Sequence, residues 1–450
     1  MAYRSMSEIP STARHASVNS GESINVSVIK ARAFSEYPEP TNRKVSRAKS
    51  VFVRTFGALK TGSLRGSIFT LILTALGPEQ LLGAALLKIN GLFLGLFGIF
   101  FGCFVAQYTL QIIAKAADEY RLYDYQALVE MLTSHKAALL LEISIILYEI
   151  GVLIGLQVIL GELMPSIWSA FQIHVSKDIS SKVSVVVLNF ALMTPLSLLK
   201  KLTTLQYVSL FAIVGIVYVT VLSLIEYPFF YEENKFDGIN YAHFSGNFLS
   251  SIPICILMYF GHSNICSVQG ELAETSLKRI TKVITRFVLS MLGIVFVLSF
   301  FSYMSTLNDT DDICILRHPA DSLKGDWPMI IGRLFMSFSV IAAVPINVKP
   351  IRIAILNMFF RENPKPYVHV VLTCSLLWIT MVASLFIPDI LTFFEFIAGI
   401  AGISVCVIFP AIIQLKMSPY SWRHKSNLVI VVLAVVLTLN SIVSVLWSIV

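Results

Sequence analysis

The most constraining feature of this sequence is a series of long apolar segments that begins near residue 67. Most are about 17–25 residues long, which lets an α-helix cross a hydrocarbon layer of about 30 Å. Backbone in lipid must satisfy its own hydrogen bonds, and a β-barrel would show alternating strands of about ten residues, so we predict membrane helices. The eleven predicted spans are residues 67–87, 91–114, 138–164, 183–199, 205–225, 246–266, 283–304, 328–348, 367–387, 390–414 and 428–448.

The composition excludes most soluble classes of protein. Hydrophobic residues make up 56% of the 450 residues and charged residues 14%, whereas soluble domains carry about 25% charged residues. The net charge of +7 does not indicate nucleic acid, because the basic residues lie mainly in a tail and in connections between spans. No catalytic motif, ATP-binding motif or metal-ligand cluster is present, so we predict no enzyme activity, no cofactor, no metal and no nucleic-acid partner.

Residues 1–65 differ from the rest of the chain, because they are rich in Ser and have no apolar periodicity. We expect them to form a disordered cytoplasmic N-terminal tail, followed by a transmembrane domain over residues 66–450. Lys and Arg are more than twice as frequent in the connections on the tail's side of the bilayer as in those on the opposite side. The positive-inside rule then predicts a cytoplasmic N-terminus and an extracellular or lumenal C-terminus. The pattern does not distinguish the plasma membrane from a vacuolar or lysosomal-type membrane.

Two of the predicted spans are interrupted. The first contains Gly77 and Pro78, which favour a break, followed at once by Glu79. The sixth contains Gly261 and His262 beside further polar residues. Spans one and six are equivalent if spans 1–5 and 6–10 form inverted repeats, and such paired breaks indicate the central site of a transporter. Freed amides can bind a carboxylate there, and freed carbonyls can bind an ammonium group or a cation.

Four stretches of the chain together resemble the amino acid/auxin permease family, within the amino acid–polyamine–cation superfamily. They are Gly77, Leu81, Asn90-Gly91 and Gly95 in and after the first span, Gly161-Glu162-Leu163, His262 with Glu271-Leu272, and Val344-Pro345 with Pro350 and Arg352. The resemblance covers about residues 66–415. It implies an all-α integral membrane protein with about eleven transmembrane helices: a LeuT-like core of five-plus-five inverted repeats with broken helices, and one extra helix. It also implies secondary transport of an amino-acid substrate by alternating access.

The departures from the family pattern concern the coupling ion. Glu79 stands where the family usually has its second Gly. Leu73 and Ala343 stand where the sodium-coupled branch typically has Asn and Thr. A sodium ion needs oxygen ligands, which alkyl side chains do not supply. The sequence therefore favours proton coupling or uniport over sodium coupling.

Three polar residues within the spans are candidates for coupling or gating. An ionised carboxylate at the bilayer centre costs about 2.5–3.5 kcal/mol on insertion scales, so Glu79 needs a reason to be there. It is either a proton site or partner of a cationic substrate, or a structural acid, with Arg333 a candidate ion-pair partner. Glu149 is a coupling site or a hydrogen-bonded structural acid. His262 is a proton relay or a structural group.

The predicted substrate site lies where the two breaks meet. We expect the substrate α-carboxylate at the amides near Glu79 to Leu81, and the α-amino group at carbonyls near Gly77 and Met258 to Phe260. Tyr259 and Phe260 either cover the substrate or are ordinary packing. The predicted substrate-binding residues are Gly77, Pro78, Glu79, Gln80, Leu81, Met258, Tyr259, Phe260 and Gly261.

The sequence thus favours a secondary active transporter of amino acids in the lipid bilayer, with protons as the coupling ion or with uniport. The acids within the spans favour a cationic substrate such as lysine or arginine. The alternative is an amino-acid-sensing receptor that signals through the N-terminal tail, and an ion channel is a third class. No obligate protein partner is evident in the sequence.

Overall fold

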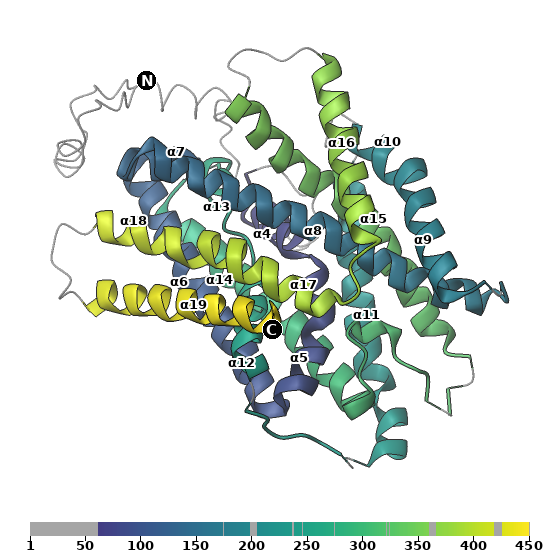
Figure 1. Ribbon diagram of the computed structural model, residues 1–450. Coiled ribbons are helices and arrows are strands. Elements are labelled where there is room, and N and C mark those ends of the chain that lie inside the picture. Colours follow the sequence, from purple (N-terminus) through teal and green to yellow (C-terminus); the bar gives the residue numbers. More distant parts are fainter. Residues whose placement is uncertain are drawn as a thin grey trace, which may run out of the picture.

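The computed structural model describes residues 62–449, apart from residues 174, 199–204, 236–237, 245, 274, 321, 324, 360–365 and 418–424 (Figure 1). The predictions for the N-terminal tail lie outside the described residues, except at the start of the first helix. Within the described residues every regular element is a helix.

The first half of the bundle begins with a helix that is interrupted and restarted. Its elements are α4 (Leu64–Ala75), η1 (Pro78–Leu82), α5 (Gly83–Asn90), α6 (Leu92–Tyr120), α7 (Tyr125–Leu132), α8 (His135–Ala170), α9 (Lys177–Leu188), η2 (Asn189–Met193), α10 (Thr194–Leu198) and α11 (Leu205–Asn234).

The second half begins in the same way. Its elements are α12 (Gly246–Leu257), α13 (Ile265–Gly270), α14 (Leu277–Thr306), η3 (Leu307–Asp309), η4 (Cys314–Leu316), α15 (Trp327–Phe359), α16 (Pro366–Ser384), α17 (Ile390–Ile397), η5 (Ala398–Gly402), η6 (Ser404–Ile408), α18 (Phe409–Met417) and α19 (Lys425–Ile449).

The described residues contain eight helices long and apolar enough to cross a membrane. A ninth span is the pair Leu64–Ala75 and Pro78–Asn90, which is bent by 64°. Two shorter apolar helices, Phe248–Leu257 and Asn427–Val443, lie at the predicted sixth and eleventh spans. The all-α multi-pass fold class is confirmed, and the count of eleven spans stays a prediction.

Several span boundaries are wider than predicted from hydropathy. For example, α8 runs over 36 residues from His135, where the prediction started at 138 and ended at 164. The apolar run marks only the part of a helix that lies in hydrocarbon, and the polar ends of a helix extend beyond it. The sequence therefore indicates which segments cross the membrane better than where each helix stops.

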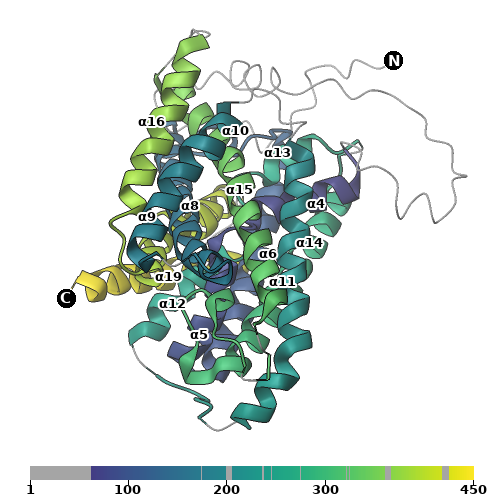
Figure 2. The same ribbon diagram turned by 90° about the vertical axis from the view of Figure 1, so that its right-hand side faces the viewer.

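The long helices pack around the interrupted first span. α15 packs against α8 and α11, α11 packs against α14, and α14 packs against α6. Figure 2 shows α14 beside α11, with α4 next to them, and Figure 1 shows α18 and α19 side by side. The outer face of α6 exposes large apolar side chains, among them Phe93 at 63% and Phe104 at 60%. Such a surface suits acyl chains and not water.

A short helix that the sequence analysis missed lies between the second and third spans. α7 starts after Asp124, whose side chain accepts a hydrogen bond from the Ala127 amide at 2.7 Å. The Tyr125 hydroxyl donates to the Val405 carbonyl at 3.0 Å. Val405 lies in η6, a π-helical turn within the tenth predicted span. α7 is therefore fixed to a distant part of the chain.

Gly102 sets the close approach of α6 to α12. A Cβ at this position would collide with the Cys255 carbonyl and lie 3.0 Å from the Ile256 amide nitrogen. Both neighbours are backbone, so they cannot rotate away. The close packing of these two helices therefore requires glycine here.

We expect Gly102→Ala to lower the thermal unfolding temperature of the detergent-purified protein, because overpacking typically costs about 1–3 kcal/mol. The matched control is Gly293→Ala on α14, where an added Cβ would meet nothing within 4 Å. Thermal melts of both variants check this, and equal melting temperatures would contradict the close-approach argument.

Candidate substrate and coupling site

The first break is built by Gly77 and Pro78. Pro78 is the first residue of η1, where its missing N–H costs nothing, and Gly77 before it is extended. The Gly77 amide donates to the Ala75 carbonyl and to Gln80 Oε1, both at 2.9 Å. The sequence prediction of a break at these two residues is confirmed by the 64° bend between the two helical halves.

Gln80 joins the two interrupted spans. Its side chain is fully buried, and its Nε2 donates to the Ala75 carbonyl at 2.6 Å and to the Met258 carbonyl at 3.2 Å. Ala75 is the last residue of α4, and Met258 is the first residue after α12. One carboxamide therefore bonds to backbone carbonyls at both breaks.

The second break separates α12 from α13. The Phe260 amide still bonds to the Leu257 carbonyl at 2.9 Å, after which the chain turns at Gly261. The buried Tyr259 donates its hydroxyl to the Ile99 carbonyl on α6 at 3.1 Å. The buried Phe260 ring lies against Tyr148, with ring centroids 4.1 Å apart. Tyr259 thus anchors the break to α6, and Phe260 faces α8.

Two buried acids lie near the first break, Glu79 in η1 and Glu149 on α8. The Tyr148 hydroxyl donates to Glu79 Oε1 at 3.2 Å, and Glu79 is only 1% exposed. Glu149 follows Tyr148 on α8 and is 3% exposed, close enough to Glu79 for their charges to interact. Its Oε2 has no hydrogen-bond partner among the described residues. The structure therefore brings together two of the three predicted coupling residues.

Arg333 does not pair with Glu79, so that candidate ion pair is wrong. Its Nε donates to the Ile315 carbonyl at 2.8 Å, and its Nη2 donates to the Arg317 carbonyl at 2.9 Å. These carbonyls belong to the connection between α14 and α15, near the end of α15 where Arg333 lies. The partner of Glu79 is a tyrosine hydroxyl and not a guanidinium.

His262 faces a different neighbour. It is fully buried, and its Nε2 lies 2.8 Å from Thr109 Oγ1 on α6. The Thr109 hydroxyl can donate to the Val105 carbonyl at 2.9 Å, so this network assigns the ring proton to Nε2. Nδ1 has no partner among the described residues. The hydrogen bond described for His262 goes to α6 and not to the two acids.

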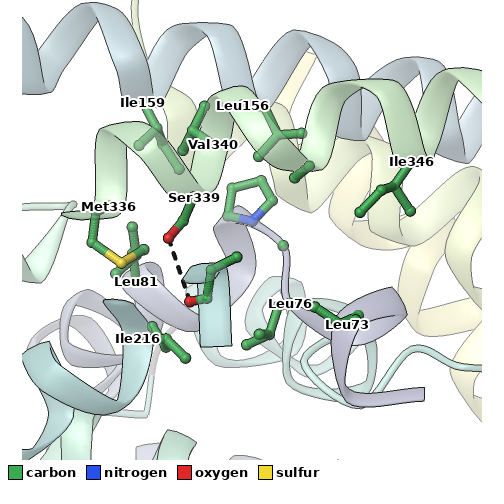
Figure 3. A pocket seen from close by; sticks show the side chains of 14 residues that line it. Leu73, Leu76, Leu81, Leu156, Ile159, Ile216, Met336, Ser339, Val340 and Ile346 are labelled. Atoms are coloured by element: carbon green, nitrogen blue, oxygen red, sulfur yellow. Dashed lines mark hydrogen bonds between the residues drawn. The ribbon is translucent and has the colours of Figure 1, made fainter. Parts of the chain in front are cut away.

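A small apolar cavity lies beside the first break, where it is lined by residues of α4, η1, α8, α11 and α15 (Figure 3). Its volume is about 30 Å³, room for about two water molecules. Ser339 supplies the only polar side chain of the lining, and its hydroxyl is within reach of the Phe335 carbonyl at 2.9 Å and the Ala212 carbonyl at 3.4 Å. The lining is formed by Leu73, Leu76, Gly77, Pro78, Leu81, Leu156, Ile159, Ala212, Ile216, Met336, Ser339, Val340, Ala343 and Ile346.

Leu73 and Ala343, which the sequence analysis compared with the sodium-coupled branch, both line this cavity. Their alkyl groups lie where a cation between α4 and α15 would need oxygen ligands. Side chains of the lining offer only the Ser339 hydroxyl. The cavity is therefore chemically suited to an apolar group and poorly suited to a bound cation.

A buried charged cluster away from the breaks was missed by the sequence analysis. Arg317 pairs with Glu226 of α11 and lies 3.8 Å from Asp326 Oδ2, and all three side chains are at most 6% exposed. The Arg317 guanidinium also lies 4.2 Å from the centre of the Phe230 ring. Burial lowers the pKa of Arg317, which its acidic neighbours oppose. A basic residue in a long connection gives no sequence signal of burial.

The chain is similar to known proteins over most of its length. Residues 60–450 match a family described as "Transmembrane amino acid transporter protein". The chain is 23% identical over 336 residues to "Putative amino acid transporter AAT1" of Toxoplasma gondii, and the match covers 73% of this chain but only 46% of that protein's length.

Two further relatives and one solved structure are similar over most of the chain. "Vacuolar amino acid transporter 6" of Saccharomyces cerevisiae is 27% identical, with 67% of this chain and 68% of that protein covered. "Sodium-coupled neutral amino acid transporter 7" of Xenopus laevis is 23% identical, with 71% and 73% covered. The structure of a manganese transporter of Eremococcus coleocola superposes with a TM-score of 0.60 at 12% identity, covering 91% of this chain and 90% of that one.

Proposed function

The chain belongs to the family of transmembrane amino acid transporter proteins, and from this premise we propose that it moves amino acids across a membrane by alternating access, driven by protons. The family membership confirms the resemblance seen in the sequence. One observation carries the proposal of proton coupling: a buried carboxyl group, Glu79, follows the break in the first span and accepts a hydrogen bond from Tyr148.

The coupling ion is inferred from the groups beside the first break. The cavity wall has alkyl groups at Leu73 and Ala343, which gives no support to a sodium site. Glu79 and Glu149 are both buried and near enough for their charges to interact. Two buried ionised carboxylates that interact are costly, so a proton bound to one of them lowers that cost. Binding and release of this proton is the proposed coupling step.

We place the substrate between the two breaks. Its α-carboxylate would meet amides near Glu79 to Leu81, and its α-ammonium would meet carbonyls near Gly77 and Met258 to Phe260. A lysine or arginine side chain would extend towards Glu79 and Glu149, because the cavity beside the break is apolar and offers it no counter-charge. The acids support a cationic substrate on this basis.

Two further proposals concern the membrane that holds the protein and a role as a receptor. One relative is named as a vacuolar transporter, which supports a vacuolar or lysosomal-type membrane over the plasma membrane. The receptor alternative depends on the N-terminal tail and stays a prediction.

We expect purified protein in liposomes to take up radiolabelled lysine when an inward pH gradient is imposed in sodium-free buffer. Adding sodium without a pH gradient should not stimulate uptake, because the side chains of the cavity lining offer the ion a single oxygen, the Ser339 hydroxyl. Collapse of the pH gradient with a protonophore is the control. Sodium-dependent uptake without a response to pH would contradict proton coupling, and the absence of uptake of any amino acid would contradict transport itself.

A further inference from the structure

The Gln80 carboxamide makes the contacts that an amino-acid head group would make. Its two N–H groups donate to the carbonyls of Ala75 and Met258, and its oxygen accepts from the Gly77 amide. We propose that Gln80 is an internal occupant of the ammonium subsite, which fills that place when the carrier is empty and which the substrate displaces. The inference rests on the proposed function, because it needs a substrate with an α-ammonium group.

The arrangement of the two acceptor carbonyls is the first support for this proposal. A primary ammonium group needs acceptors that converge from more than one direction. The carbonyls of Ala75 and Met258 come from different broken helices and converge on a single side-chain nitrogen, at 2.6 Å and 3.2 Å. The Met258 carbonyl follows the end of α12, and the Ala75 carbonyl, at the end of α4, also accepts from the Gly77 amide at 2.9 Å. A substrate ammonium at this position would take over the two bonds that the carboxamide nitrogen now makes.

The burial of these groups is the second support. Gln80 is fully buried, and so is Met258. A buried carbonyl left without a donor carries the desolvation cost of an unmade hydrogen bond. The bound carboxamide removes that cost in a state without substrate. The neighbouring cavity, at about 30 Å³, is far smaller than the roughly 300–1,000 Å³ typical of ligand pockets. In this closed arrangement the carbonyls of Ala75 and Met258 are both paired without a substrate.

This arrangement has a kinetic consequence. A carrier that accumulates substrate must return empty through a closed state, whereas an exchanger returns loaded. An internal occupant makes the empty closed state accessible, because the carbonyls stay paired during the return. Loss of the occupant should therefore slow net uptake more than it slows exchange. It should also strengthen substrate binding, since the substrate no longer competes with a side chain.

The first arm of the test uses the unmodified protein in liposomes. We expect radiolabelled lysine to enter liposomes that contain no internal substrate, which requires the empty return. If the protein exchanges substrate in preloaded liposomes but takes up none into empty ones, the inference is overturned while amino acid transport stands. If neither assay gives uptake of any amino acid, the proposed function fails.

The second arm compares Gln80→Ala with unmodified protein. We expect net uptake to fall by about tenfold or more, because one unpaired buried carbonyl already costs enough for a factor of ten. Exchange in preloaded liposomes should fall less than net uptake does, so the ratio of net uptake to exchange falls, and the apparent Kd for substrate should also fall. A parallel loss of net uptake and exchange, or no change in their ratio, would overturn the proposal. Gln80→Met, which keeps the length of the side chain without its polar groups, gives the same comparison if the alanine variant does not fold.

The matched control is Gln157→Ala. Gln157 is also fully buried, and it donates to Thr380 Oγ1 at 2.9 Å and accepts from Asn189 at 2.8 Å, between α8, η2 and α16. Its removal tests the loss of a buried carboxamide that is not at the breaks. We expect a lower unfolding temperature with an unchanged ratio of net uptake to exchange. A ratio shifted as in Gln80→Ala would mean that the effect is one of general stability, which would overturn the inference.

Discussion

Replacing Glu79 with Gln is expected to lower the pH-driven accumulation of substrate by more than about tenfold. Exchange of substrate, with substrate present on both sides of the membrane, should continue. A glutamine keeps the size of the side chain and can still accept the hydrogen bond from Tyr148, which Glu79 receives at 3.2 Å. It cannot bind and release a proton in the working range. The measurement is lysine uptake into liposomes under an imposed pH gradient, beside counterflow without a gradient.

The same variant separates the two roles proposed for Glu79. If Glu79 also pairs with a cationic side chain, lysine should lose its advantage over leucine as a competitor, because the attraction between opposite charges is gone. The matched control is Glu162→Gln, the same chemical change on α8, where Glu162 pairs with Lys177 at 3.1 Å and both side chains are at least one-third exposed. Lysine transport that is indifferent to Glu79→Gln would contradict both roles.

Replacing Arg317 with Met is expected to cause the largest loss of stability of any single substitution considered for this protein. The change leaves Glu226 and Asp326 buried without their cation, and breaking a buried pair in this way typically costs about 3–5 kcal/mol. Thermal melts of the purified protein measure it. Arg121→Met is the matched control, since Arg121 is 63% exposed and lies 3.8 Å from Asp118. A loss no greater than in that control would show that the cluster contributes little.

The stability deficit of Arg317→Met should shrink as the pH falls. Burial raises the pKa of Asp326, and the Arg317 charge opposes that rise. Without Arg317 the folded-state pKa rises further above the unfolded value, so ionisation costs the folded state more. Stability is then present below the unfolded pKa and is lost as pH rises through the folded pKa. Melts at several pH values check this, and a deficit that grows on acidification would contradict it.

Local chemistry made the two breaks predictable. Gly77 and Pro78 stop a helix by removing a donor and by extending the chain, and no tertiary contact can restore the missing N–H. The second break follows from Gly261 among polar residues, and α12 does end at Leu257. The apolar runs likewise reported the multi-pass fold, since the bilayer imposes a minimum length on each span.

The partners of the key side chains could not be predicted, because they come from distant parts of the chain. Tyr148 reaches Glu79 across 69 positions, and Gln80 reaches Met258 across 178. Arg317 meets Glu226 across 91 positions, from a connection that reads as exposed. The sequence indicated which polar residues are candidates for function. Which of them form hydrogen bonds or ion pairs with one another is decided by tertiary packing.

The hydrogen bond from Tyr125 to Val405 has a mechanical consequence. Val405 lies in a π-helical turn, whose wider winding weakens the internal ladder of a helix and lets an outside donor reach a carbonyl. The short helix α7 connects the second and third spans in the chain, yet it is hydrogen-bonded to the tenth. During a transport cycle α7 should therefore move together with the tenth span. A fluorophore attached to α7 would then report the movement of the tenth span, although Tyr125 and Val405 are 280 residues apart in the chain.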